Sequence, residues 1–449
     1  MKRKTAFVKK LDFTYWSSPV EDITLHTVSP LTRYDKYFKF QAATNSWATI
    51  LNGNEIMTAA RGYIMRAPDN FSSTVPAQYE VSFVGKPHNG LVETPALASV
   101  GTNRWNLIGN PYPSAVSALA FLNDVDNVPA VDGTIYIWTH QTNPTNNGSG
   151  IYVYSANDYI TFNRTGTVTV SPGNMTTPFN GNIAAGQGFF IKATQNNATA
   201  KFKNSMRVTP ASTFYRMAGA EGKSESGEMD RLWLDITNVQ GGFNQMLVGY
   251  MPEATNGFDR GYDGEKLSGA GISLYSMIDN TRYTIQGRAP FAVSDEVVLG
   301  YSSTAAATLK ISLSSFEGVF NSQDIYLIDH ILNVTHNIKN GPYEFASAVG
   351  TFNSRFTLVY QASSLGNPDV ISADAAVNVV TNTDILVRST GMALKTVTVY
   401  DILGKKLFDS QDNIGGQDFE ITSIGRQNQI LLVKIKLEDG SQAVRKIQY

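Results

Sequence analysis

Alternating apolar and polar positions recur along most of the chain and predict short β-strands. In Tyr37–Phe40, Phe38 and Phe40 fall on one face, and in Ile135–Trp138 the aliphatic side chains separate from the aromatic ones. The one helix-like segment is Ser114–Asn123, with Ser114 as its candidate N-cap. The pattern predicts an all-β protein made of tandem antiparallel β-sandwich modules.

Two pairs of segments in the first half resemble each other. Phe13–Pro19 aligns with Trp105–Pro111 at an offset of 111 − 19 = 92 residues, and Arg61–Ala67 aligns with Gln187–Ala193 at 188 − 62 = 126 residues. The second copy therefore holds 126 − 92 = 34 extra residues between these landmarks. We predict a duplicated β-module. Chance similarity among aromatic-rich strands is the alternative.

The strand pattern is interrupted twice, and these interruptions divide the chain. Met217–Met229 and Ala362–Asp369 are rich in small and polar residues, which is typical of linkers. A series of short strands punctuated by Gly, Asn and Pro lies between them and is typical of a β-sandwich. The predicted units are residues 1–100 (first copy), 101–217 (second copy), 230–362 (β-sandwich) and 370–449 (a small Ig-like β-sandwich).

Composition narrows the classes of function. The 449 residues carry a formal net charge of −2 and no cysteine, so we expect no nucleic-acid partner, no disulfide and no thiolate site. No apolar run is long enough for a transmembrane helix. The basic N-terminus lacks the apolar core of a secretory signal peptide. Together with the C-terminal sequence, this leads us to expect the C-terminal part of a longer protein.

The C-terminal sequence has a recognisable order: Val399–Lys406, then Leu432–Gly440, then Val444–Ile447. These segments resemble the C-terminal sorting domain of type IX secretion cargo in Bacteroidota. Tyr15–Pro19 and Trp105–Pro113 are similar to modules that often precede such domains in flavobacterial surface proteins.

The match departs from the commonest pattern in two places. Asn367–Asp369 stands where many sorting domains have Pro-Asn-Pro, and Gln429-Ile430 replaces a Gly-Tyr. These departures resemble the subclass labelled type C. The route of cleavage and lipopolysaccharide attachment therefore stays open.

The resemblance implies export through the periplasm and recognition of the last domain by the outer-membrane barrel shuttle and translocon of the type IX system. A C-terminal hairpin with free edge groups and a mobile Gln448–Tyr449 tail suits such a partner. The residues expected to form the recognition surface and its scaffold are Tyr400, Asp401, Gly404, Lys405, Lys434, Asp439, Gly440 and Lys446. The alternative is that the glycines and Asp439 only form turns and the lysines only keep an edge soluble.

Two further clusters carry candidate chemistry. Tyr136, Trp138, Tyr152 and Tyr154, with Tyr159, are candidates for a face that stacks on sugar rings, with core packing as the alternative. Asp259, Asp263 and Glu265 place carboxylates in a Gly-rich loop, where calcium is one hypothesis and Asx-type turns are the other. We expect no other metal or cofactor, because the histidines form no pair at metal-ligand spacing.

No nucleophile elbow, phosphate loop or dinucleotide fingerprint is present, so we predict a non-enzymatic protein. The leading hypothesis is a secreted or cell-surface protein whose β modules form a stalk or adhesive segment and whose last domain is the export signal. One alternative is a set of glycan-binding modules belonging to a larger polysaccharide-degrading enzyme. Another is a freestanding glycan-binding protein.

Overall fold

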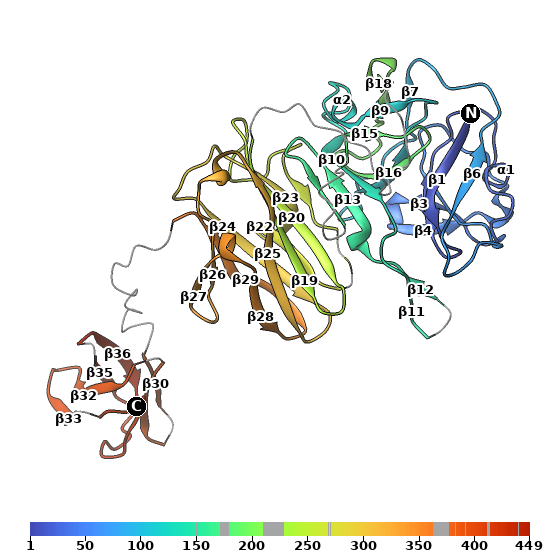
Figure 1. Cartoon of the computed structure of the whole chain (residues 1–449). Coiled ribbons are helices and arrows are strands. Elements are labelled where there is room, and N and C mark those ends of the chain that lie inside the picture. Colours follow the sequence, from blue (N-terminus) through green and yellow to red (C-terminus); the bar gives the residue numbers. More distant parts are fainter. Residues whose placement is uncertain are drawn as a thin grey trace. The chain divides into compact units, whose positions relative to one another are not determined.

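The structure is a computed structural model that describes residues 1–148, 151–170, 179–209, 229–267, 269, 271–361, 377–381, 383–390, 392–410, 414–438 and 440–449. It divides into two compact units, Met1–Ala362 and Ser363–Tyr449 (Figure 1). Both predicted linkers lie outside the described residues, apart from Met229. The division of the chain into four modules stays a prediction.

The first part of Met1–Ala362 is a four-stranded antiparallel sheet in the order β2-β5-β3-β4. One face of the sheet packs on a core that contains Trp16, Tyr37 and Tyr63, all nearly or fully buried. The elements of this part are β1 (Lys2–Val8), β2 (Phe13–Trp16), α1 (Leu25–Val28), β3 (Tyr37–Gln41), β4 (Ser46–Thr49), β5 (Tyr63–Arg66), β6 (Ala77–Ser82) and β7 (Val92–Glu93).

The second part is built around a five-stranded sheet in the order β14-β13-β10-β16-β8. Ile135 and Ile137 of β10 enter the core beneath one face, and Tyr136 and Trp138 lie on the other, as the period-two pattern predicts. The elements of this part are β8 (Trp105–Gly109), β9 (Ala115–Ser117), α2 (Ala118–Leu122), β10 (Val131–Trp138), β11 (Thr145–Asn146), β12 (Tyr152–Val153), β13 (Tyr159–Phe162), β14 (Thr167–Val168), β15 (Asn182–Ile183), β16 (Gly188–Ala193), β17 (Lys201–Phe202) and β18 (Arg207–Val208).

These two sheets have the same strand order and the same register. β2-β5-β3-β4 corresponds to β8-β16-β10-β13. Phe13 pairs with Arg66 as Trp105 pairs with Lys192. Trp16 pairs with Tyr63 as Ile108 pairs with Phe189, which is the correspondence required by the sequence offsets of 92 and 126. A shared register over several residues is not expected from unrelated strands, because a slip of one residue would turn every side chain to the other face.

The two copies contact each other through equivalent residues. The Ser17 backbone N–H donates to the Gly186 carbonyl at 2.8 Å, and the Gly109 N–H donates to the Ala60 carbonyl at 3.1 Å. Isolated β-bridges join Trp16 to Gln187 and Ile108 to Arg61. Each contact becomes its counterpart when the two copies are exchanged, so the arrangement is pseudo-two-fold.

Between the two sheets lies an aromatic layer to which both copies contribute. Its fully or largely buried members include Tyr15 and Ile64 from the first sheet and Leu107, Tyr136 and Phe190 from the second. The layers therefore run core, sheet, aromatic layer, sheet, core. The inner strands β5, β10 and β16 have one face on the core of their own copy and the other toward the neighbouring copy, which explains their dense apolar patterning.

The rest of this unit is an eleven-stranded sheet in which β20 and β23 are parallel and the other pairs are antiparallel. It packs on the second copy, where Arg231 Nη1 donates to the Thr165 carbonyl at 2.9 Å and Trp233 Nε1 donates to the Thr167 carbonyl at 2.8 Å. Its strands are β19 (Asp230–Asn238), β20 (Phe243–Tyr250), β21 (Gly264–Glu265), β22 (Ser273–Ile278), β23 (Thr281–Arg288), β24 (Glu296–Ser303), β25 (Ala307–Glu317), β26 (Tyr326–Asp329), β27 (Val334–Asn337), β28 (Tyr343–Ser347) and β29 (Gly350–Val359).

The predicted helix at Ser114–Asn123 is shorter than the sequence suggests. Ala115–Ser117 is strand β9, and only Ala118–Leu122 is helical. Ser117 is the N-cap, since its side chain accepts a hydrogen bond from the Ala120 N–H at 3.2 Å. Ser114 is therefore not the cap, because pairing of β9 with β15 and β18 keeps the preceding residues extended.

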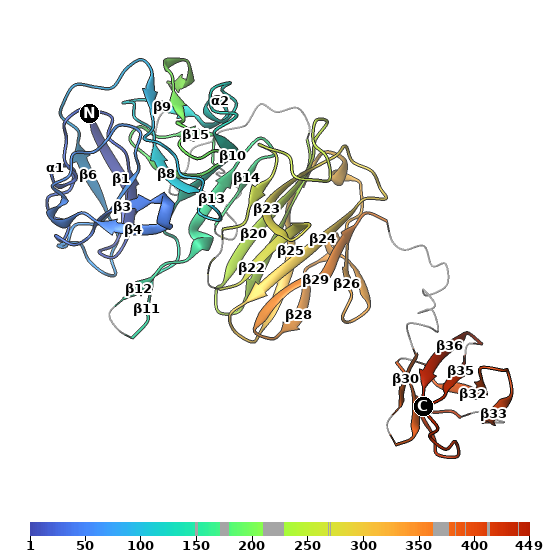
Figure 2. The ribbon, with the colours of Figure 1, turned by 180° about the vertical axis from the view of Figure 1, so that it is seen from behind.

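Ser363–Tyr449 is a small sandwich of two antiparallel sheets, ordered β30-β31-β34 and β33-β32-β35-β36, around a core of its own. Figure 2 gives the same ribbon from behind. The all-β prediction, with tandem antiparallel sheets, is confirmed. The strands are β30 (Val377–Thr381), β31 (Ile385–Ser389), β32 (Leu394–Asp401), β33 (Lys406–Asp409), β34 (Asp418–Ile421), β35 (Ile430–Leu437) and β36 (Gln442–Gln448).

The expectation of a mobile C-terminal tail is wrong. Tyr449 is only 2% exposed, and its hydroxyl donates to the Thr383 carbonyl at 2.7 Å. Its backbone exchanges two hydrogen bonds with Gln429. A tyrosine whose hydroxyl finds a hydrogen-bond partner is more stable when its ring is buried in the core than when it is exposed in a tail. The residue pattern of β36 alone does not show this burial.

Gly62→Ala tests the contact between the copies. A Cβ at Gly62 would collide with the Leu107 side chain and lie 2.7 Å from the Ile108 carbonyl oxygen. We expect a loss of about 1–3 kcal/mol in the free energy of unfolding of Met1–Ala362, as overpacked sites show. Urea unfolding followed by tryptophan fluorescence measures it, because all 5 tryptophans precede residue 363.

The control for this variant is Gly257→Ala, where the added Cβ approaches only Thr255 Oγ1, at 3.6 Å. This change is expected to stay within about 0.5 kcal/mol of the wild type. Equal stability of the two variants would contradict the close approach of the two copies at Gly62.

Candidate functional site

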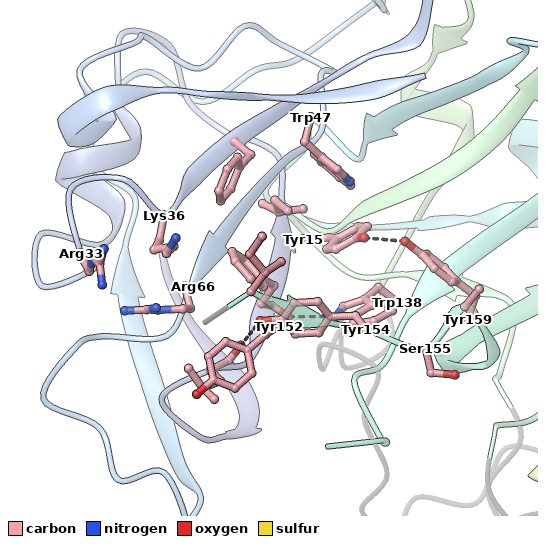
Figure 3. A pocket seen from close by; sticks show the side chains of 16 residues that line it. Tyr15, Arg33, Lys36, Trp47, Arg66, Trp138, Tyr152, Tyr154, Ser155 and Tyr159 are labelled. Carbon is pink, nitrogen blue, oxygen red and sulfur yellow. Dashed lines mark hydrogen bonds between the residues drawn. The ribbon is translucent and has the colours of Figure 1, made fainter. Parts of the chain in front are cut away.

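A groove of about 660 Å³ opens at the edge of the aromatic layer, where the first and second copies meet (Figure 3). Both copies line it. The lining residues are Leu11, Phe13, Tyr15, Arg33, Lys36, Phe38, Trp47, Ile64, Arg66, Trp138, Ile151, Tyr152, Tyr154, Ser155, Ala156 and Tyr159.

Several aromatic rings of the groove are held in place by their polar atoms. Tyr15 and Trp138 stack with ring centroids 5.7 Å apart and planes 13° apart. Trp138 Nε1 donates to the Phe13 carbonyl at 3.1 Å, and the Tyr154 hydroxyl donates to the Leu11 carbonyl at 2.9 Å. The Tyr15 and Tyr159 hydroxyls hydrogen-bond to each other. These rings therefore form a rigid floor.

Burial keeps the floor uncharged. It raises the pKa of the Tyr15 hydroxyl well above its ordinary value, with the neighbouring Tyr159 adding to the shift. It also raises the pKa of Tyr159, although the hydrogen bond from Tyr15 opposes this. Both phenols are thus protonated at any physiological pH.

A buried His–Asp pair lies beside the floor and joins the copies. His140 Nε2 lies 2.9 Å from Asp12 Oδ1, and both side chains are almost completely buried. The Phe13 N–H points to His140 Nδ1 at 3.4 Å, which places the ring proton on Nε2. Because both of its ring nitrogens face first-copy groups, His140 positions the strand that carries Phe13 and Tyr15.

Two rings of the groove remain open to solvent. Trp47, on β4 of the first copy, is 39% exposed, and Tyr152, on β12 of the second copy, is 38% exposed. Figure 3 places them on opposite sides of the floor. They are the aromatic faces available to a ligand.

One end of the groove is cationic. Arg33, Lys36 and Arg66 line it, and the lining residues described above include no carboxylate. Arg33 and Lys36 both contact Asp35, at 2.7 and 3.2 Å. Burial raises the pKa of Asp35, but hydrogen bonds from Lys36 and Arg33 outweigh it, so the pKa lies below its ordinary value. This carboxyl is charged and shared between two cations.

The structure separates the four aromatic residues proposed from the sequence. Trp138, Tyr152 and Tyr154 line the groove, whereas Tyr136 is fully buried. Its ring packs edge-on against Trp105 at 4.8 Å, and its hydroxyl donates to the Glu265 carbonyl at 3.0 Å. Tyr136 therefore presents no face to a sugar, because it lies deeper in the aromatic layer than Trp138.

Sequence reasoning missed the contribution of the first copy. Tyr15, Trp47 and the three cations come from segments to which no ligand role was assigned. The repeat could have indicated this contribution, since Phe13–Trp16 corresponds to Trp105–Ile108. Two copies of an aromatic-rich strand can bury their aromatic faces against each other.

The three carboxylates of the calcium hypothesis have separate partners. Asp259 accepts from Thr255, and Asp263 accepts from the Gly287 N–H at 2.9 Å. Glu265 is ion-paired with Lys192. Within the described residues, no group of three or more His, Cys, Asp and Glu side chains is placed to hold a metal ion. Asp259 and Asp263 accept from Thr255, Asp259 and Gly287 and not from the N–H two residues later, so neither forms an Asx-type turn, and calcium binding stays a prediction.

Tyr400, Lys434 and Lys446 of the proposed recognition set are brought onto one face. Tyr400 pairs with Leu432, and Leu432 pairs with Lys446. Lys434 is two residues from Leu432 on β35 and therefore shares its face, which points away from the core. The lysines are exposed and Tyr400 is partly exposed.

The other described members of the set, Asp401, Gly404, Lys405 and Gly440, lie at turns. Asp401 Oδ1 accepts from the Leu403 and Lys405 N–H groups, each at 2.9 Å, and Gly404 has φ +82°, where glycine is favoured. Gly440, with φ +88°, lies in the β35–β36 turn at the opposite end of the hairpin. Asp439 lies outside the described residues.

Comparison with known families places most of the chain. Residues 1–360 match the family described as "Domain of unknown function (DUF8693)". The chain belongs to this family. Residues 365–449 of this chain match a second family, which is described as "Domain of unknown function (DUF8694)". The two matches meet close to the boundary between the two compact units at residue 362.

The chain is also similar to a fimbrial subunit. It is 25% identical over 282 residues to the "Minor fimbrium subunit Mfa5" of Porphyromonas gingivalis, an alignment that covers 59% of this chain and 21% of that protein. The chain thus spans about a fifth of the length of this relative. Across the described residues, no helix has the length and apolarity needed to cross a membrane.

Asp132 on β10 is expected to make the stability of Met1–Ala362 depend on pH. Burial raises its pKa to about 7, whereas an unfolded chain has a pKa of about 3.9. The folded state therefore holds the extra proton, and this stabilisation is complete below about pH 4 and is lost as pH rises through about 7. Asp132→Asn keeps an acceptor for the Thr134 N–H and removes the titration.

We expect the wild type to lose stability relative to Asp132→Asn between pH 4 and pH 8, at about 1.4 kcal/mol per unit of pKa difference. Urea unfolding at several pH values measures this. Parallel curves for the two proteins across that range would contradict a raised pKa at Asp132.

Proposed function

We propose that this family member is part of a cell-surface adhesive protein and that the groove between its two copies binds saccharides. The observation that carries the proposal is the pair of exposed rings, Trp47 and Tyr152, on either side of a rigid aromatic floor. Flat aromatic surfaces with few polar groups suit the apolar faces of sugar rings. Similarity to a fimbrial subunit supports a surface location and an adhesive role.

The lining favours binding over cleavage. Glycoside hydrolysis ordinarily needs two carboxyl groups on either side of the scissile bond. The lining residues described above contain none, and the nearby Asp12 is buried against His140. The protein is therefore proposed to hold a glycan without hydrolysing it, whether it acts alone or as an ancillary part of a larger enzyme.

A second proposal concerns Ser363–Tyr449, which we propose to be the export signal of the type IX secretion system. Its own core, its separate family match and its resemblance to sorting domains support a self-contained signal. The face formed by Tyr400, Lys434 and Lys446 is the proposed contact for the outer-membrane barrel shuttle and translocon.

Removing either exposed ring tests the saccharide proposal. The full chain is applied to a glycan array, and the glycans that bind are titrated calorimetrically. Trp47→Ala and Tyr152→Ala are each expected to weaken binding about tenfold, since a stacked ring contributes roughly 1 kcal/mol or more. Phe258→Ala removes a 52% exposed ring outside the groove and serves as the control. A silent array, or equal losses in all three variants, would sink the proposal.

The export proposal is tested by fusing Ser363–Tyr449 behind a signal peptide and a fluorescent protein in a flavobacterial host. The reporter is expected at the cell surface, and Lys434→Glu with Lys446→Glu is expected to leave it in the periplasm. Arg388→Glu, a charge reversal at an exposed position of β31, is the matched control. Periplasmic retention of the unaltered fusion in a secretion-competent strain would contradict the proposal.

A further inference from the structure

We infer that the groove ligand is a saccharide that carries a carboxylate, and that Arg66 binds this carboxylate. The inference rests on the proposed function of the groove and specifies its ligand class. It begins from a cation that the fold buries without fully satisfying it.

Arg66 is held rigidly at the end of β5. Its backbone N–H donates to the Lys36 carbonyl at 3.1 Å, and its carbonyl accepts from Thr32 Oγ1 at 2.6 Å. The side chain is only 7% exposed, and Nη2 donates to Asp69 Oδ1 at 2.8 Å. The guanidinium is therefore preorganised.

The Nε–H of Arg66 has no hydrogen-bond partner among the described residues, although the atom is buried. A buried unpaired donor on a charged group costs free energy, and such groups are normally paired. Because Arg66 also lines the groove, a ligand oxygen is the natural acceptor (Figure 3). A carboxylate matches the planar guanidinium best and forms a charge-assisted hydrogen bond.

The surrounding charges favour an anion. Asp69 is shared between Arg66 and Lys10, the latter at 3.3 Å. Asp35 is likewise shared between Arg33 and Lys36. The three cations that line the groove contact two carboxylates, which leaves a local charge of 3 − 2 = +1 at this end of the groove.

The ligand must satisfy the cationic end and the aromatic walls together. A ring with one apolar face and one carboxylate, as in uronic and sialic acids, does so: the ring lies on the exposed faces of Trp47 or Tyr152 while the carboxylate reaches Arg66. A neutral sugar would leave the Nε–H of Arg66 without a charged acceptor.

The experiment compares acids with their uncharged methyl esters on the full chain. Tetragalacturonic acid, a hyaluronan tetrasaccharide and sialyllactose are titrated calorimetrically, each beside its methyl ester, together with tetraglutamate as an acidic peptide. At least one saccharide acid is expected to bind at least ten times more tightly than its ester. Added salt is expected to weaken the binding of the acid but not the binding of the ester. Arg66→Gln is expected to reduce this ratio to within twofold.

Lys10→Gln is the matched control. It also removes one positive charge that contacts Asp69, but Lys10 is not one of the residues that line the groove. This variant is expected to retain the preference for the acid over its ester. If Arg66→Gln does not fold, Arg66→Lys keeps the charge without the planar Nε–H donor and is expected to lower the ratio at least fivefold. An unchanged ratio in the folded variant overturns the inference.

The outcomes separate this inference from the function on which it rests. Acids and esters that bind equally, with binding still weakened by Trp47→Ala, overturn the carboxylate and leave the saccharide groove standing. Tighter binding of tetraglutamate than of every saccharide also overturns the inference. Failure of every saccharide, neutral or acidic, overturns the proposed function and the inference together.

Discussion

The reciprocal backbone contact between the two copies is the constraint on which the first unit depends. Ser17 donates to Gly186 and Gly109 donates to Ala60, so the residues before β5 and β16 are tied to the edge strands of the opposite copy. This contact sets the two sheets face to face, and their outward aromatic residues must then bury each other. The groove is the part of that aromatic layer that remains accessible to solvent. A binding surface thus follows from packing a duplicated sheet on itself.

Much of this fold could be predicted from the sequence, because a period of two determines which face a side chain takes. The pattern assigns Phe38, Phe40, Tyr136 and Trp138 to the correct faces, and the two copies that the repeat predicts have the same strand register. The sequence could not predict how deeply each side chain is buried within the aromatic layer. Tyr136 is buried and Trp138 reaches the groove because of what the other copy places above them.

The cationic end of the groove also could not be predicted from the sequence, because charge depends on which residues the fold brings together. A net charge of −2 over the whole chain conceals a local surplus, since Arg33, Lys36 and Arg66 are brought together from a loop and the end of a strand. Similarly, the sequence predicts a C-terminal hairpin but not the docking of Tyr449, which depends on Thr383 and Gln429. In both cases the deciding contact joins residues that are far apart in the sequence.

The most direct measurement of the central claim is a crystal structure of the chain with a bound acidic saccharide. The account predicts the sugar between Trp47 and Tyr152, with its carboxylate within hydrogen-bond distance of Arg66 Nε and the two copies joined as described. A ligand bound elsewhere, with the groove empty, would contradict the account.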